Sequence, residues 1–143
     1  MTPAQKNLVQ STWSKVVPIA DTAAKMFYDR LFEIDSSTQP LFRGADLAEQ
    51  RKKLLQVLSA AIAGLDNLEG LVPVVETLGR RHAGYGVKDA HYDSVGAALL
   101  WTLEKGLGDS WTKDTAAAWT EVYGVLSGVM RRAQKEAIAE AMA

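Results

Sequence analysis

Apolar residues recur along the chain at the three- and four-residue spacing of amphipathic helices, and no segment alternates as a half-buried strand would. The first stripe consists of Leu8, Val9, Thr12, Trp13, Val16 and Val17. Thr2 is placed to cap this helix, with Gln5 reaching back to it, and Pro3 fits its first turn. Pro18 is expected to end or kink it.

The same spacing predicts further helices from 21 to 34, from 46 to about 65, from about 71 to 84, from about 90 to 105, and onward from about 111. Asp46 with Glu49 marks the start of the third, whose inner face comprises Leu47, Gln50, Leu54, Val57, Leu58, Ala61 and Leu65. Segments 35–40 and 42–45 are expected to be turn and loop, and 106–111 a loop. The chain is therefore predicted to be one all-α domain, 1–143, with six or seven helices.

Three polar residues interrupt the apolar stripes. His82 lies on the buried stripe of its helix, Gln50 lies on the inner face of another, and Tyr28 lies between two phenylalanines. One imidazole and two uncharged polar groups in an apolar, all-helical interior match a haem pocket for a gaseous ligand. The structural alternatives stay open, namely a core histidine, an amide reaching solvent, and a tyrosine bonded to a carbonyl.

Other metal sites fit the composition poorly. Haem iron needs only one protein ligand, because the porphyrin supplies four nitrogens, whereas structural zinc wants four nitrogen or sulfur ligands and the chain has no cysteine. A di-iron bundle wants Glu-x-x-His, but Gly79 and Lys88 stand three residues before His82 and His91. The lack of cysteine also excludes thioether-attached haem, and the cofactor that we expect is haem b, iron protoporphyrin IX.

Charge and hydropathy restrict the partners. The net charge of −1 gives no long-range attraction to nucleic acid or to an anionic membrane. No apolar run reaches the ~18–20 residues that span a bilayer. The chain opens with a helix start and not with a basic segment followed by an apolar one, so we expect no nucleic-acid or membrane partner and a cytoplasmic location.

Several widely spaced segments resemble a known family. They are Leu-Asp-Asn-Leu-Glu-Gly-Leu at 65–71, Leu-Gly-Arg-Arg-His at 78–82, Tyr-Gly-Val at 85–87 and His-Tyr at 91–92, together with Trp13, Trp119 and Tyr123-Gly124. In this order and spacing they resemble the single-domain bacterial haemoglobins of the Vitreoscilla type and the globin half of flavohaemoglobins, over essentially the whole chain. The resemblance implies a globin fold around one haem pocket.

The resemblance also implies roles for individual residues. It makes His82 the proximal iron ligand, Phe42 a contact wedged against the porphyrin, Gln50 the distal residue, Leu54 a contact beside the gas, and Tyr28 the second-helix tyrosine that reaches it. Leu78 is expected to bind the cofactor, and Lys53 either meets a haem propionate or is solvated.

The proximal side departs from the flavohaemoglobin pattern. Tyr92 matches a tyrosine that orients the histidine alongside a glutamate from the last helix. Here Gln134 stands at the matching position, which argues against a strongly electron-donating, peroxidase-like histidine. Ser36 stands where globins usually have proline.

The residues and the resemblance agree on haem b with O2, CO or NO as ligand. Tyr28 and Gln50 predict tight oxygen binding, because bound oxygen carries partial negative charge that hydrogen-bond donors stabilise. Tight retention suits scavenging, or dioxygenation of nitric oxide by means of a separate reductase, better than bulk transport. The alternatives are a haem-based gas sensor or partner-binding module and a haem-free interaction protein of globin fold.

Overall fold

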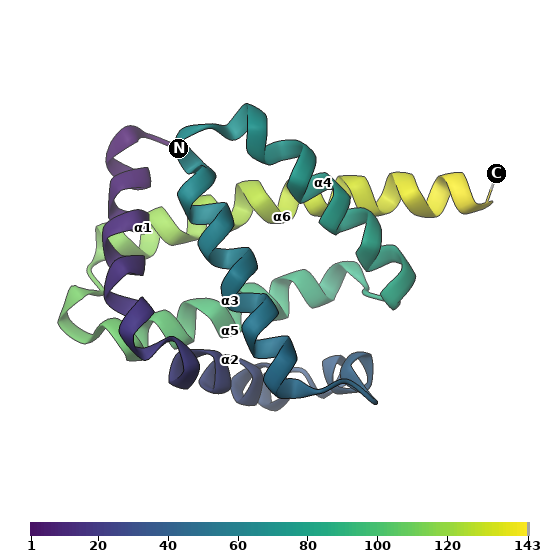
Figure 1. Cartoon of the computed structure of the whole chain (residues 1–143), viewed down its shortest axis with the longest axis horizontal. Helices are drawn as coiled ribbons and strands as arrows, with labels where there is room; N and C mark the ends of the chain where they lie inside the picture. The colour runs from purple at the N-terminus through teal and green to yellow at the C-terminus, as the bar shows by residue number, and fades with distance from the viewer. Residues whose placement is uncertain (143) are drawn as a thin grey trace.

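Six α-helices make up most of the computed structural model, which describes residues 1–142 (Figure 1). They are α1 (Pro3–Val16), α2 (Ala20–Ile34), α3 (Leu47–Ala63), α4 (Leu68–Tyr85), α5 (Asp89–Leu107) and α6 (Lys113–Met142). Short 3-10 segments join them: η1 (Val17–Ile19), η2 (Ser36–Phe42), η3 (Gly64–Asp66) and η4 (Gly108–Ser110). The predicted all-α class is confirmed. None of the helices within residues 1–142 is long and apolar enough to cross a membrane.

The predicted start signals are confirmed by local hydrogen bonds. The Thr2 hydroxyl accepts from the Gln5 backbone N–H at 3.1 Å, and the Gln5 side chain accepts from the Thr2 N–H at 2.9 Å. The Asp46 carboxylate accepts from the first N–H groups of α3. These side chains satisfy donors that a helix start otherwise leaves without partners.

Two sequence expectations need correction. Val17 was assigned to the first buried stripe, but it is 53% exposed because α1 ends at Val16 and the chain turns through η1. The loop expected from Gly106 begins two residues later, since Leu107 remains helical and packs into the core. Gly108, with a φ of +54°, then ends the helical run, a backbone angle that glycine adopts without strain.

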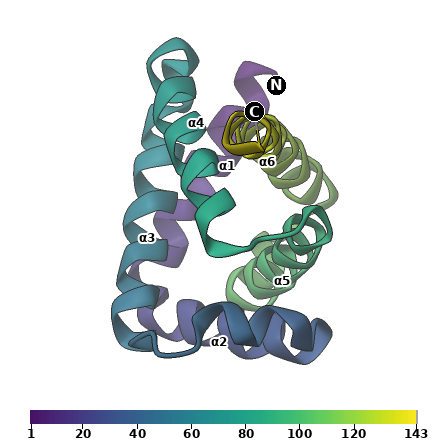
Figure 2. The ribbon, with the colours of Figure 1, turned by 90° about the vertical axis from the view of Figure 1, so that its right-hand side faces the viewer.

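Consecutive helices α3 and α4 diverge from η3 (Figures 1 and 2). α4 packs mainly along α6, and it makes few contacts with α3. The apolar stripes of both helices therefore stay partly accessible: Leu54 and Leu78 are half-buried, and Val57, expected on the inner face, is 42% exposed. The accessible surface of 8188 Å² exceeds the roughly 7,200 Å² expected for a chain of 15.5 kDa.

The close contact between α4 and α6 requires glycine at position 79. A Cβ on Gly79 would lie 2.5 Å from the main-chain oxygen of Met130 and 2.7 Å from its Cα. Backbone atoms cannot move aside as a flexible side chain can. The packing of α4 on α6 therefore depends on the missing side chain.

We predict that Gly79→Ala lowers the free energy of unfolding by about 1–3 kcal/mol, because α4 must shift away from α6. Gly84→Ala is the matched control on the same helix, since nothing lies within 4 Å of its added Cβ. It should raise stability by up to about 1 kcal/mol through the better helix propensity of alanine. Urea unfolding followed by far-ultraviolet circular dichroism measures both, and equal stabilities would contradict the packing argument.

Candidate functional site

His82 presents one free ring nitrogen from the last turns of α4. Its Nδ1 lies 2.6 Å from the main-chain oxygen of Leu78. A carbonyl oxygen only accepts, so Nδ1 carries a proton, and in the neutral imidazole Nε2 is then the nitrogen with the lone pair. Nε2 has no hydrogen-bond partner among residues 1–142, and the side chain is half-buried. An imidazole held in this tautomer is suited to bind a metal through Nε2.

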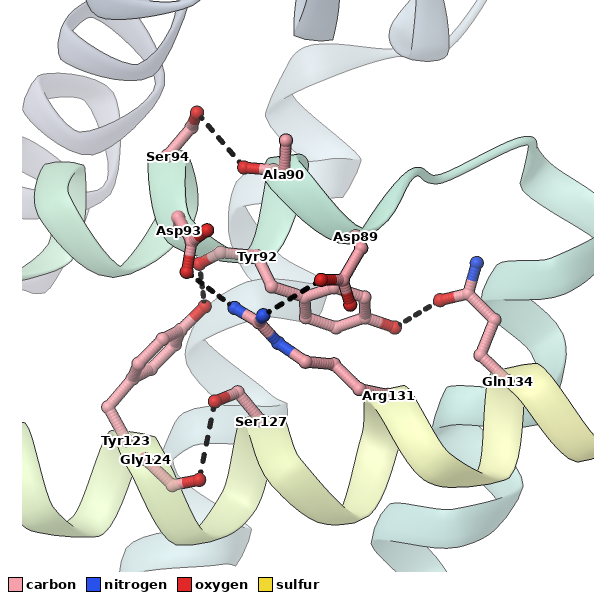
Figure 3. A network of polar contacts seen from close by, with 10 residues as sticks. All are labelled: Asp89, Ala90, Tyr92, Asp93, Ser94, Tyr123, Gly124, Ser127, Arg131 and Gln134. Carbon is pink, nitrogen blue, oxygen red and sulfur yellow. Dashed lines mark hydrogen bonds and ion pairs between the residues drawn. The ribbon is translucent and has the colours of Figure 1, made fainter.

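Aromatic rings surround this imidazole. The Tyr92 ring stacks on it with centroids 6.0 Å apart and an interplanar angle of 30°, and Tyr85 lies 5.7 Å away. The buried Tyr92 hydroxyl donates to Gln134 Oε1 at 2.5 Å, and Gln134 Nε2 donates to the main-chain oxygen of Val87 (Figure 3 shows Tyr92 and Gln134). Tyr92 therefore lies beside His82, and Gln134 is bonded to the Tyr92 hydroxyl.

Tyr28, on α2, is buried with its hydroxyl near α3. Its ring packs against Phe27, Phe32 and Phe42, the last at 5.4 Å and nearly perpendicular. The hydroxyl donates to the main-chain oxygen of Gln50 across 3.5 Å, the upper limit for such a bond. Burial raises the pKa of Tyr28 to about 12 against a smaller opposing effect of Arg51, so the phenol keeps its proton at neutral pH.

The other predicted site residues on the distal side lie on η2 and α3. Phe42 ends η2 beside Tyr28, whereas Gln50 and Leu54 are half-buried on α3, and Lys53 is exposed. Tyr28, Phe42 and Gln50 are brought together, as are His82, Leu78 and Tyr92. Within residues 1–142 no hydrogen bond or ring contact joins the first group to the second.

Two cavities adjoin the Tyr28 group. A small one of about 20 Å³ has walls from α1, α2, α3 and α5: Trp13, Val16, Ala23, Ala24, Phe27, Leu54, Leu55, Leu58, Leu99, Thr102 and Leu103. It has room for about one water-sized molecule, and its walls are apolar, so it is expected to stay dry. A larger one of about 400 Å³ borders Phe42 and opens between η2 and the start of α3.

His91 is held in a separate polar cluster that the sequence did not predict. It is buried, its Nδ1 accepts from the Lys88 N–H at 2.9 Å, and its Nε2 lies 3.0 Å from the Ser37 hydroxyl. Ser37 donates in turn to the Asp35 carboxylate, so Nε2 carries the proton. Hydrogen bonds from Ser37 and Ser94 lower the pKa of Asp35. Both nitrogens of His91 are thus occupied, and His82 is the histidine available as a ligand.

Arg131 is the main residue near the site that sequence reasoning missed. It lies on α6 beside Tyr92 and pairs with Asp89 and Asp93 on α5. The available signal was the spacing: the two aspartates lie one turn apart and flank Tyr92, and Arg131 stands three residues before Gln134. Among the described residues no group of three or more His, Cys, Asp or Glu side chains lies close enough to hold a metal.

A family model described as Globin matches residues 25–130. The chain belongs to the globin family. The predicted fold class and the predicted family are therefore both confirmed. The matched residues of this globin run from the middle of α2 into α6.

Individual relatives come from bacteria and from a fish. The globin is similar to the flavohemoprotein of Bacillus subtilis (strain 168), at 31% identity over 90% of this chain and 33% of the relative. It is similar to neuroglobin of Tetraodon nigroviridis, at 29% identity over 89% and 88%. The flavohemoprotein of Rhizobium meliloti (strain 1021) is 28% identical over 95% and 34%. The chain thus spans about a third of the length of the flavohemoproteins it matches.

The family implies a haem cofactor, and the residues of this globin fit one. Globins ligate haem iron through a histidine, and within the described residues His82 Nε2 has no hydrogen-bond partner. The accessible stripes of α3 and α4 supply apolar surface for a porphyrin through Leu54 and Leu78. Tyr28 and Gln50 are neutral, so no buried charge opposes the binding of an uncharged gas.

The raised pKa of Tyr28 predicts a loss of stability at alkaline pH. An unfolded tyrosine ionises near pH 10, whereas folded Tyr28 keeps its proton to about 12, so unfolding releases a proton between these values. The free energy of unfolding should therefore fall with rising pH from about 10 to about 12.

Tyr28→Phe should make this fall less steep, and the remaining slope belongs to Tyr92 and Tyr123, whose pKa values burial also raises. Urea unfolding at a series of alkaline pH values measures the difference. An unchanged slope in the variant would contradict the burial of this hydroxyl.

Proposed function

We propose that this globin binds haem b through His82 Nε2 and holds oxygen tightly with Tyr28 and Gln50. The observation that carries the proposal is the hydrogen bond from His82 Nδ1 to the Leu78 carbonyl, which leaves Nε2 as the donor nitrogen. Membership of the globin family and similarity to proteins named flavohemoprotein support it. Haem iron, when bound, supplies reversible binding of oxygen, carbon monoxide or nitric oxide.

On the proximal side, no carboxylate is hydrogen-bonded to His82 within the described residues. Its Nδ1–H is bonded to a backbone carbonyl, which is a weaker acceptor than a carboxylate. Gln134 is uncharged, and both ends of its amide are occupied by Tyr92 and Val87. A carboxylate that accepted the Nδ1–H bond would make His82 a stronger electron donor. His82 bonds a backbone carbonyl in its place. This arrangement favours reversible gas binding over peroxidase-like chemistry.

On the distal side, we propose that the Tyr28 hydroxyl and the Gln50 amide donate hydrogen bonds to the gas. The Tyr28 bond to the Gln50 carbonyl is long, so little is lost when the hydroxyl turns to a better acceptor. Hydrogen bonds to charged acceptors are worth about 1.5–3 kcal/mol each. Bound oxygen carries more negative charge than bound carbon monoxide, so both donors stabilise oxygen preferentially.

The remaining site residues shape the pocket around the porphyrin. Phe42 is fixed by its ring contacts with Tyr28 and Phe32, and it supplies a rigid apolar wall. Leu54 and Leu78 supply apolar contacts from the two diverging helices. Exposed Lys53 is proposed to meet a haem propionate, where its long stem reaches the carboxylate while its ammonium stays in water.

Tight oxygen binding suits a scavenger, or an enzyme that oxidises nitric oxide to nitrate, better than a carrier. Repeated nitric oxide dioxygenation needs an electron source, because each cycle consumes one electron from the iron. We propose that a separate cytoplasmic reductase supplies it. The oxygen dissociation rate and the rate of reduction by such a protein distinguish storage from turnover.

His82→Ala should abolish stable haem retention, because α4 carries no other histidine. The control is His91→Ala, which removes the other histidine of the chain, whose two nitrogens are already bonded. The measurement is the ratio of Soret to protein absorbance after gel filtration of haem-reconstituted protein. Haem bound equally by wild type and His82→Ala would disprove the proximal assignment.

Tyr28→Phe and Gln50→Leu should each speed oxygen dissociation by roughly 10- to 150-fold, the equivalent of one hydrogen bond to a charged acceptor. Carbon monoxide dissociation should change much less. Stopped-flow ligand replacement measures both rates in the same preparations. Equal acceleration for the two gases would show that the substitutions alter access to the pocket and not hydrogen bonding.

A further inference from the structure

The guanidinium of Arg131 lies between two carboxylates on α5 (Figure 3). Its Nη1 is 3.3 Å from Asp89 Oδ2, and its Nη2 is 2.7 Å from Asp93 Oδ1. The hydrogen bond that Arg131 donates to Asp93 is the first cause of the raised pKa of Arg131, so the side chain is always a cation. The Arg131 side chain is 24% exposed, whereas Asp89 and Asp93 are 58% and 75% exposed, so the arginine is the shielded partner of each pair.

The two carboxylates place this cation over Tyr92. Asp89 stands three residues before Tyr92 and Asp93 one after, and the Arg131 Cζ lies 5.1 Å from the centre of the ring. Arg131 Nε is buried without a hydrogen-bond partner within the described part of the chain. Its position is therefore set by the two carboxylates and the ring, and not by full satisfaction of its own donors.

Tyr92 is held at three points. Arg131 packs on the ring, the hydroxyl donates to Gln134, and the main-chain oxygen accepts from the Tyr123 hydroxyl (Figure 3). If the ring swung away about the Cα–Cβ bond, it would lose both the hydroxyl bond to Gln134 and the contact with Arg131. The same ring stacks on His82.

His82 needs such a wall to hold its ring orientation. One hydrogen bond, from Nδ1 to the Leu78 main-chain oxygen, holds the imidazole at one edge. The opposite edge, which carries Nε2, is not held by this bond. Tyr85, the other neighbouring ring, is 60% exposed and gives little support. Tyr92, which is buried, is the firm surface beside the imidazole.

We propose that Arg131 is a positioning residue for His82 and acts through Tyr92. By clamping the Tyr92 ring, it limits the imidazole to one orientation, and hence limits the direction of the Nε2 lone pair. The inference rests on the proposed function, in which Nε2 binds haem iron. Arg131 itself touches neither His82 nor the gas site, so it is not a catalytic residue.

The test replaces Arg131 by Met, which keeps a similar stem and removes the cation. Arg132→Met is the matched control, because the neighbouring arginine is exposed. The readout is the iron–histidine stretching band in the resonance Raman spectrum of the reduced haem protein. Arg131→Met should shift and broaden this band, since the imidazole then samples several orientations, and Arg132→Met should leave it as in wild type.

Further variants separate positioning from general stability. Arg131→Lys keeps the charge but cannot bridge both carboxylates, so its band should lie between those of wild type and Arg131→Met. Asp93→Asn weakens the shorter ion pair and should shift the band in the same direction as Arg131→Met. This variant also tests the proposal if Arg131→Met does not fold. Urea unfolding of the haem-free proteins reports stability alone.

A band unchanged in folded Arg131→Met, or unchanged in Asp93→Asn, overturns the positioning role. A loss of stability without a band shift also overturns it, because it assigns Arg131 to packing only. Failure of the proposed function looks different: wild-type protein would show no iron–histidine band. The wild-type spectrum is therefore recorded first.

Discussion

The close approach of α4 to α6 at Gly79 is the constraint on which the site depends. Because a side chain there would collide with the backbone of Met130, only glycine lets the two helices touch. α4 thereby packs on α6 and not on α3, its neighbour in the chain. The apolar stripes of α3 and α4 then stay partly accessible, and His82, three residues after Gly79, lies on one of them. The close packing of α4 on α6 thus leaves the apolar stripes of α3 and α4 accessible for binding.

On the proximal side, the ion pairs contact Tyr92 and not His82. The two distal donors, Tyr28 and Gln50, are uncharged, as is Gln134, which bonds Tyr92. The cation of Arg131 lies against the Tyr92 ring and offsets one of the two carboxylates with which it pairs. Ions in this outer position fix geometry without placing an unpaired charge beside an uncharged ligand. A carboxylate in place of Gln134 would remove this separation.

Much of the fold could be predicted from local sequence, whereas the contacts within the site could not. The caps at Thr2 and Asp46 depend on residues two or three positions away, and both formed as predicted. Burial was harder to predict, because a stripe shows which face is apolar but not whether another helix covers it; Val57 lies on such a face and is 42% exposed. His82 and Tyr28 were predicted as site residues from their polar character on apolar stripes, and their roles toward haem stay a proposal.

The helices, the place of His82 on an apolar stripe and the absence of thiol chemistry follow from the sequence, because periodicity and caps depend on neighbouring positions and the lack of cysteine on composition. The tertiary structure alone decided which distant residues meet. It placed Arg131 against Asp89, 42 residues away, and it joined His91 to Ser37, 54 residues away. Such pairs depend on where helices cross and how closely they pack, and these are set by side-chain volumes along whole interfaces.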